Sequence, residues 1–166
     1  VMASLPAGVQ IVALRREMLR DAATINLDRR AAPAVGITQA AYPVDAKLKG
    51  PLLLALLRRG DMKSALVFTR TKHRANRLAD WLERQGVRAA RIHGNRSQSQ
   101  RTLALEGFKA GRFDVLVATA IAARGIDVVA LGHVVNYDVP AASEDYIHRV
   151  GRTGRAELTG EAFTFV

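Results

Sequence analysis

The segment HRVGRTGR, residues 148–155, contains three arginines, one histidine and two glycines. If its first part is helical, His148, Arg152 and Arg155 share one face at i, i+4 and i+7. Each glycine costs a helix roughly 1 kcal/mol, which suits an early helix end or close approach of the backbone to a ligand. Arginine offers planar, bidentate donors to phosphate. The segment therefore predicts an arginine finger for a phosphoryl group held by another domain, with a basic surface helix as the plainer interpretation.

The charge of the chain also indicates an anionic partner. Its 166 residues include 25 Lys and Arg against 15 Asp and Glu, a formal net charge of +10. Such an excess most often accompanies nucleic acid binding, although a merely soluble basic surface is the alternative. The absence of cysteine excludes disulfides and cysteine-ligated metal sites, and the four histidines have no metal-site spacing. No apolar run approaches a membrane span and no signal peptide is visible, so we expect a cytoplasmic protein without membrane contact.

Short apolar runs alternate with amphipathic stretches along most of the chain. This alternation predicts an α/β fold with a mostly parallel sheet and helices on both faces. Residues 1–35 differ, with a helical pattern, a short strand and a linker, so we expect the compact domain to cover residues 36–166. Strands are expected at 64–69, 87–93, 114–119, 133–139 and 161–166, and helices at 47–60, 73–86 and 95–111.

Polar and basic residues follow three of the expected strands, where ligands of parallel sheets bind. These strand exits are RTK (70–72), GNRSQSQR (94–101) and AIAARGID (120–127). Hydroxyls, backbone N–H groups and arginines can hold phosphates. In the second exit, Gln98 and Arg101 face the same way at the start of a helix, which fits either an anion site or a capping box with a solvated arginine.

The chain lacks a phosphate-cradling P-loop. The segment GDMKS (60–64) has no second glycine beside its lysine and precedes a strand instead of following one. No run of acidic residues is present that could hold Mg²⁺. The parts that bind a nucleoside triphosphate in the first place are therefore expected on another domain.

Four segments, in this order, resemble the motifs of the second RecA-like domain of DEAD-box RNA helicases. They are VFTRT (67–71), HGN (93–95) with the glutamine and arginine that follow, ATAIAARGID (118–127) and HRVGRTGR (148–155). The resemblance covers roughly residues 36–166 and implies a RecA-like fold. His148 favours the DEAD-box branch, because DNA-helicase and DEAH relatives usually have glutamine there. The amino-acid sequence of these segments is most similar to that of the bacterial RhlE-like group.

The resemblance implies roles for residues at matching positions. Arg152 and Arg155 would reach the γ-phosphate of ATP, and His148 would order the attacking water. Asp127 would bind the ribose, with Gly125 allowing close backbone approach. The implied RNA-backbone residues are Thr69, Arg70, Gly94, Gln98 (supporting Arg101), Arg101 and Thr119, and Arg124 and Arg149 would couple the two sites.

The same resemblance implies cofactors and partners. ATP and Mg²⁺ would be bound mainly by an N-terminal RecA-like domain of the same protein, and RNA would be held by its sugar-phosphate backbone. The fragment alone is expected to be inactive, with catalysis arising when the two domains close. The alternative is a non-catalytic basic RecA-like module that binds RNA or protein. Half of a DNA helicase is disfavoured by His148.

Two positions depart from the family pattern. Ala120 stands where aspartate usually follows the threonine, which predicts weaker coupling between RNA binding and hydrolysis. The start, VMASLP, resembles a degraded form of the motif that closes the first domain. Residues 1–30 would then be a remnant of that domain, packed on something else such as a second copy of the chain, giving a possible homodimer.

Overall fold

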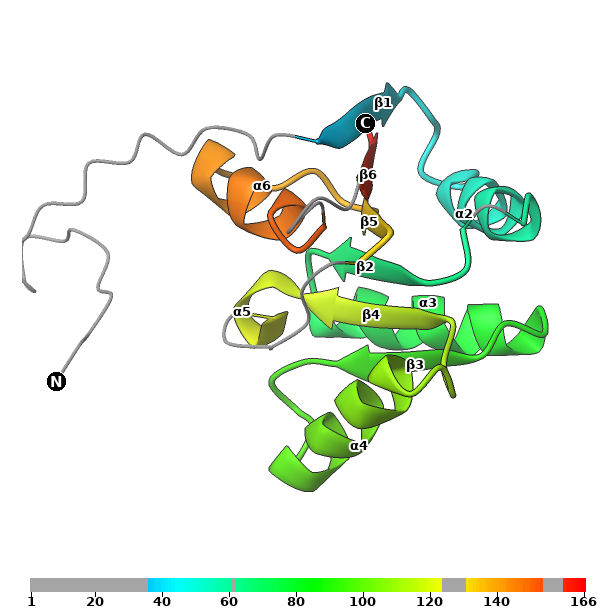
Figure 1. Cartoon of the computed structure of the whole chain (residues 1–166), viewed down its shortest axis with the longest axis vertical. Helices are drawn as coiled ribbons and strands as arrows, with labels where there is room; N and C mark the ends of the chain where they lie inside the picture. Colours follow the sequence, from blue (N-terminus) through cyan, green and yellow to red (C-terminus); the bar gives the residue numbers. More distant parts are fainter. Residues whose placement is uncertain (1–35, 61, 124–130, 154–159) are drawn as a thin grey trace, which may run out of the picture. The chain divides into compact units, whose positions relative to one another are not determined.

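The computed structural model describes residues 36–60, 62–123, 131–153 and 160–166. Its strands form one six-stranded sheet in the order β1-β6-β5-β2-β4-β3, and every neighbouring pair is parallel (Figure 1). The α/β prediction with a mostly parallel sheet is confirmed. The strands are β1 (Ile37–Tyr42), β2 (Ala65–Thr69), β3 (Ala89–Ile92), β4 (Val115–Thr119), β5 (His133–Asn136) and β6 (Gly160–Phe165). The helices are α2 (Lys49–Arg58), α3 (Lys72–Arg84), α4 (Gln98–Lys109), α5 (Ala120–Ala123) and α6 (Ser143–Val150).

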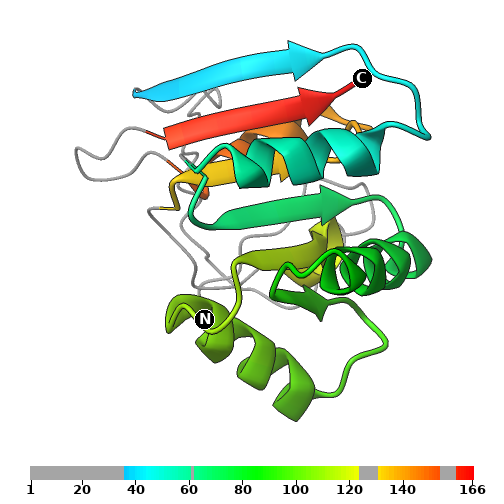
Figure 2. The same ribbon diagram turned by 90° about the vertical axis from the view of Figure 1, so that its right-hand side faces the viewer.

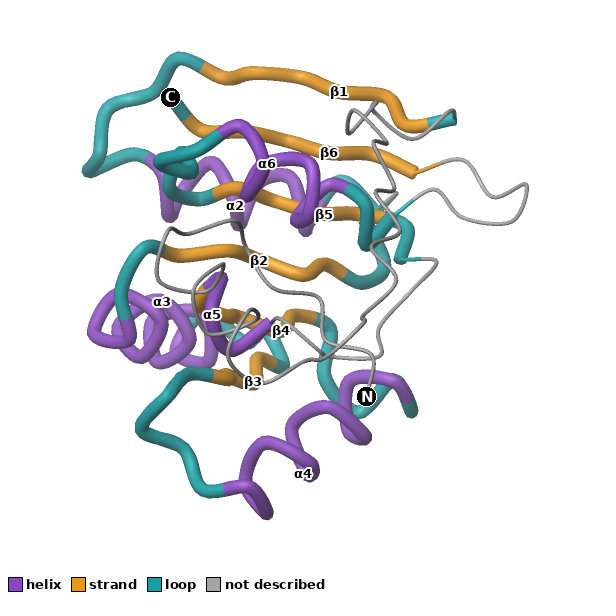
Figure 3. The backbone as a smooth tube through the Cα atoms, turned by 90° about the vertical axis from the view of Figure 1, so that its left-hand side faces the viewer, coloured by secondary structure: helices purple, strands orange, loops and turns teal. Residues whose placement is uncertain are grey.

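Helices cover both faces of the sheet, as the alternation of elements predicts. One face is covered by α2 and α3 (Figure 2). These helices bury Leu53 and Leu82 against strand residues such as Val67. On the other face, Phe108 of α4 packs with strand residues such as Phe68, and α5 and α6 lie on the same side (Figure 3). The central strand β2 is buried on both faces, which explains its continuous apolar sequence.

Local signals determine where α3 and α4 begin and end. The hydroxyl of Thr71 accepts a hydrogen bond from the backbone N–H of Arg74 and caps α3. Ser97 and Gln100 form a capping box at the start of α4, so the predicted N-cap is confirmed. Beyond the ends of these helices, Gly86 and Gly111 have φ of 83° and 72°, a conformation that favours glycine.

The structure differs from the sequence-based prediction at several boundaries. Residues 37–42 form β1, which was not predicted as a strand. The fourth expected strand ends at Asn136 instead of residue 139, because the chain turns there and the N–H of Asp138 bonds the carbonyl of Phe68. Helix α2 covers Lys49–Arg58 and is shorter at both ends than the expected range 47–60. None of the helices within the described residues is long and apolar enough to cross a membrane.

Candidate functional site

The carboxyl ends of β2, β3 and β4 bring together the predicted RNA-facing residues. Arg70 and Gly94 are exposed at this edge, and Thr119 is half-buried. Thr69 differs, because its side chain is fully buried and its hydroxyl donates to the carbonyl of Thr71 at 3.3 Å. Thr69 therefore shapes the turn after β2 and does not present its hydroxyl to solvent.

The first turn of α4 holds an arginine that is docked on the neighbouring segment. The guanidinium of Arg101 donates to the side-chain oxygen of Gln98 at 3.3 Å and to the backbone carbonyl of Ala122 at 3.2 Å. The capping box of the plainer interpretation is present, but the arginine is not simply solvated. The contact joins the exit of β3 to α5, the helix that directly follows β4.

His93 stabilises the turn that presents Gly94. It is buried, with its Nε2 2.9 Å from the side-chain oxygen of Asn76, and its Nδ1 accepts the backbone N–H of Asn95. Burial lowers the pKa of His93 below its ordinary value, and the nearby cations, with Arg96 the foremost, lower it further. The imidazole is therefore held neutral as a structural bridge between α3 and the exit of β3.

Arg149 of α6 is a buried cation. Its Nη1 donates to the side-chain oxygen of Asn136 at 3.3 Å and to the carbonyl of Asp138 at 3.0 Å. Its guanidinium carbon lies 5.2 Å from the centre of the Phe68 ring. Burial lowers the pKa of Arg149, although the charges of Asp145 and Asp138 oppose that shift. Arg149 therefore attaches α6 to the ends of β2 and β5.

Asp138 was not singled out by the sequence. Its buried carboxylate accepts the backbone N–H of Arg70 at 2.8 Å and forms an ion pair with the guanidinium of Arg74. Because the carbonyl of the same residue accepts from Arg149, Asp138 joins the turn after β2 to α6. The sequence placed Asp138 inside the expected strand 133–139, whereas β5 ends at Asn136. A carboxylate directly after this strand is the signal that could have found it.

His148 and Arg152 lie around a small cavity of about 20 Å³ that Ala120 and Arg149 also line. Helix α6 ends at Val150 with Gly151 as its C-cap, so the early helix end is confirmed. Arg152 lies in the following turn and not on a continuous helical face, which corrects the i, i+4 expectation. His148 is exposed, and the Nε of Arg149 is buried without a hydrogen-bond partner within the described residues.

Several predicted residues lie outside the described residues. These are Arg124, Gly125, Asp127 and Arg155, together with residues 1–35, on which the first-domain remnant and the homodimer depend. The division of the chain near residue 36 thus stays a prediction. Within the described part of the chain, no group of three or more His, Asp or Glu side chains could hold a metal ion.

Comparison with known proteins identifies the family to which the chain belongs. A family model described as the helicase conserved C-terminal domain matches residues 49–157. The structure of the E. coli DEAD-box protein SrmB, solved bound to regulator of ribonuclease activity A, is 38% identical with a TM-score of 0.72. That match covers 77% of this chain and 75% of the SrmB chain. This chain belongs to the C-terminal domains of the DEAD-box helicases.

Other members of this helicase family share the fold. The C-terminal domain of the DEAD-box protein Dbp5 is 34% identical with a TM-score of 0.72, over 79% of this chain and 77% of the Dbp5 chain. The yeast DEAD-box splicing factor Prp28 is 32% identical with a TM-score of 0.74 over 79% of this chain, but that match covers only 29% of Prp28. The RecA-like fold is thus shown, whereas membership of the RhlE-like group stays a prediction.

Proposed function

We propose that this chain is the C-terminal half of an ATP-dependent RNA helicase that unwinds short RNA duplexes. In this proposal Arg152 and Arg155 are arginine fingers, which place positive charge beside the phosphoryl group as it is transferred. His148 orders the attacking water. The N-terminal RecA-like domain closes onto the face of the sheet that carries α6. The catalytic site is complete only when the two domains are together.

The observation that carries the proposal is the buried connection between α6 and the turn after β2. Arg149 and Asp138 hold the segment with His148 and Arg152 against the segment with Arg70. A shift in the position of one segment would therefore move the other, because two buried polar groups join them. Such a connection suits the coupling of RNA binding to ATP hydrolysis, in addition to holding α6 against the sheet.

The described residues fit one side of a nucleotide site. ATP, with Mg²⁺, supplies the phosphoryl group, and the N-terminal domain is proposed to bind both. His148 and Arg152 offer cationic and hydrogen-bonding groups next to the cavity, which suits phosphate oxygens. Gly125 and Asp127 are proposed to contact the ribose.

The proposed RNA path follows the carboxyl edge of β2, β3 and β4. Arg70, Gly94 and Thr119 are accessible there, and Arg101 is fixed by Gln98 and the carbonyl of Ala122. Thr69 contributes by shaping the turn, and Arg124 is proposed to link the RNA path to the ATP side. Contacts to phosphate and sugar make RNA binding largely independent of sequence.

Ala120 weakens this connection in the proposal. It lines the same cavity as Arg149 and Arg152, and its methyl group cannot accept a hydrogen bond from either guanidinium. We infer that RNA binding and hydrolysis are less tightly coupled here than in relatives with aspartate at this position.

The test is to join this chain to the first domain of a DEAD-box protein and to measure RNA-stimulated ATP hydrolysis. Arg152→Ala is expected to lower the stimulated rate by roughly 10³-fold or more, since an arginine finger contributes about that much. Arg112→Ala, an exposed arginine in the loop after α4, is the matched control and should leave the rate unchanged.

A binding module without catalysis gives the opposite result. RNA would then be bound tightly and with a steep salt dependence, no stimulated hydrolysis would be measured, and Arg152→Ala would not alter the affinity. A parallel titration with DNA of the same sequence distinguishes an RNA helicase half from a DNA helicase half, because only RNA carries the 2′-hydroxyl.

A further inference from the structure

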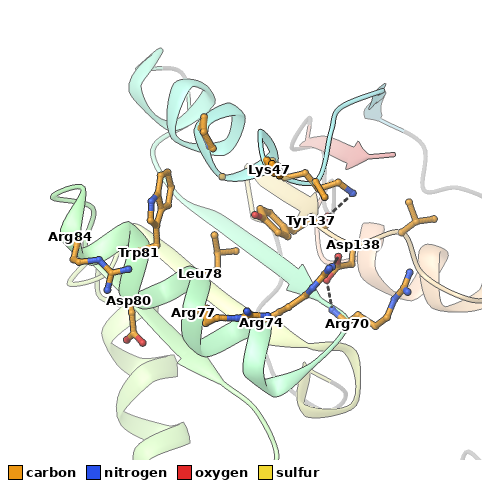
Figure 4. A pocket seen from close by; sticks show the side chains of 15 residues that line it. Lys47, Arg70, Arg74, Arg77, Leu78, Asp80, Trp81, Arg84, Tyr137 and Asp138 are labelled. Atoms are coloured by element: carbon orange, nitrogen blue, oxygen red, sulfur yellow. Dashed lines mark hydrogen bonds and ion pairs between the residues drawn. The ribbon is translucent and has the colours of Figure 1, made fainter.

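A groove of about 750 Å³ runs between α2 and α3 (Figure 4). These two helices cover the face of the sheet opposite to α4, α5 and α6, so the groove lies on the other side of the sheet from His148 and Arg152 (Figures 2 and 3). Domain closure onto α6 would therefore leave the groove accessible. The DEAD-box motifs account for one residue of its lining, Arg70, which stands at the end nearest the strand exits.

The floor of the groove is apolar. Leu78 and Trp81 of α3 face Gly50 and Pro51 of α2 across it. Trp81 packs on the backbone of α2, since a Cβ added at Gly50 would lie 3.5 Å from Cη2 of the indole. The indole is nevertheless only half-buried, and Trp81 is the sole tryptophan of the chain. A half-buried aromatic ring beside a leucine in a concave site is a common anchor point in protein interfaces.

The rim of the groove is cationic. Arg77 and Arg84 project from α3, and Lys47 lies on the opposite bank before α2 (Figure 4). None of these three makes an ion pair within the described part of the chain. The two carboxylates of the groove are already engaged, because Asp138 binds Arg74 and Asp80 binds Arg91. The rim thus has positive charge to offer and no free negative charge.

We propose that this groove binds a short acidic segment of a partner protein, with its apolar side chains between α2 and α3. Leucine or phenylalanine side chains would contact Trp81 and Leu78, and carboxylates on the flanks would meet Arg77, Arg84 and Lys47. An amphipathic segment laid between two helices is a recurrent mode of peptide recognition. The peptide would lie on the opposite face of the sheet from α6, although Arg70 and Asp138 at one end of the groove also belong to the proposed RNA-facing connection.

An acidic peptide fits the groove better than a strand of RNA. Single-stranded nucleic acid is held by aromatic faces that are free for stacking. Here each aromatic ring already packs on the domain with part of its surface: Trp81 on Gly50, and Tyr137 with its ring centre 5.9 Å from that of Phe165. Phosphates could pair with the rim, but the apolar floor would have no base stacked on it. A peptide uses the floor and the rim together.

The experiment is a titration of this chain followed by the fluorescence of Trp81, which reports on the groove alone. The probe is a synthetic peptide with glutamates on one helical face and leucine and phenylalanine at i and i+4 on the other. It is expected to shift the Trp81 emission. The double reversal Arg77→Glu/Arg84→Glu should weaken binding about tenfold or more, because two rim attractions become repulsions. The single reversals should show intermediate losses.

Controls separate the groove from a general basic surface. Arg112→Glu, on the far side of the sheet, should leave peptide affinity unchanged, and thermal unfolding checks that each variant is folded. A peptide with alanine in place of leucine and phenylalanine should bind at least tenfold more weakly, because its apolar contacts with the floor of the groove are lost.

Three results would overturn the proposal. The first is a peptide affinity that the double reversal leaves unchanged, or no binding at all. The second is an oligouridylate that shifts Trp81 emission and loses affinity in the same variant, which would assign the groove to RNA. The third is an emission that depends on protein concentration without any peptide, which would assign the groove to a second copy of the chain.

Discussion

The guanidinium of Arg149 lies over the ring of Phe68, with 5.2 Å between its central carbon and the ring centre. A cation on the last turn of α6 is thereby buried against the central strand of the sheet. Two further hydrogen bonds, to Asn136 and to the carbonyl of Asp138, fix its orientation. Arg149 is therefore the arginine of the HRVGRTGR segment that points into the protein and supports the packing of α6.

Arg149→Ala is expected to destabilise the fold strongly. The change removes the stacking on Phe68 and leaves the side-chain oxygen of Asn136 and the carbonyl of Asp138 without their donor. We expect the free energy of unfolding to fall by about 3 kcal/mol, the range seen when a buried polar network is broken. Urea denaturation measures the loss. The control Arg112→Ala should stay within about 0.5 kcal/mol of the unchanged chain, and an equal loss in both would contradict a special role for Arg149.

Asp138 and Arg74 are expected to be energetically coupled. Asp138→Asn removes the charge that pairs with Arg74, so stability should fall by about 1–2 kcal/mol. Arg74→Ala should cost a similar amount although its side chain is 45% exposed, because it leaves a buried carboxylate with fewer partners. In a double-mutant cycle the two losses should overlap. Strictly additive losses would show that the ion pair contributes nothing beyond its separate groups.

Ala120→Asp should stabilise the chain and strengthen coupling. The new carboxylate would face a cavity lined by Arg149 and Arg152, where the Nε of Arg149 is buried without a partner within the described residues. A charge-assisted hydrogen bond there should add about 1–2 kcal/mol to the free energy of unfolding. Ile121→Asp is the matched control, because Ile121 is 84% exposed on the same short helix. A carboxylate at Ala120 that lowers the melting temperature would contradict this prediction.

The stability of the domain should fall as the pH falls below the ordinary histidine pKa. The pKa of His93 is lowered in the folded chain, so the unfolded chain binds the proton more readily. The contribution of His93 is complete above about pH 6.5 and is lost progressively as the pH falls toward the lower, folded pKa. Unfolding of the unchanged chain and of His93→Gln should be compared across this range. The pH dependence should be smaller in His93→Gln, whereas the exposed His73→Gln control should keep it.

Most of the fold was predictable because its signals are local. The buried strands β2 and β4 are continuous apolar runs, and the ends of α3 and α4 are marked by Thr71, Ser97 and the glycines that follow each helix. Strand β1 was not predicted because it lies at the edge of the sheet and three of its six residues are exposed. Its sequence, ITQAAY, lacks the apolar run on which the other strands were recognised.

The site was predictable where its residues follow a strand and not where distant segments meet. The contact between Gln98 and Arg101 follows from helical spacing alone. The burial of Arg149 depends on Phe68, Asn136 and Asp138, which come from two other strand ends. The groove beside Trp81 likewise exists only because α2 packs next to α3. Such features arise from the order of strands in the sheet, which residue spacing does not reveal.

The pairing of β1 with β6 has a consequence for how the chain acquires its structure during synthesis. In the described sheet β1 lies at the edge and its neighbour is β6, although Ile37 and Gly160 are separated by nearly the whole domain. Strand β1 thus leaves the ribosome long before β6. Its backbone N–H and C=O groups cannot form their hydrogen bonds with β6 until then. Pairings this distant slow folding and leave strand edges open to other chains in the meantime. Nascent chains should therefore depend on chaperones until β6 has emerged.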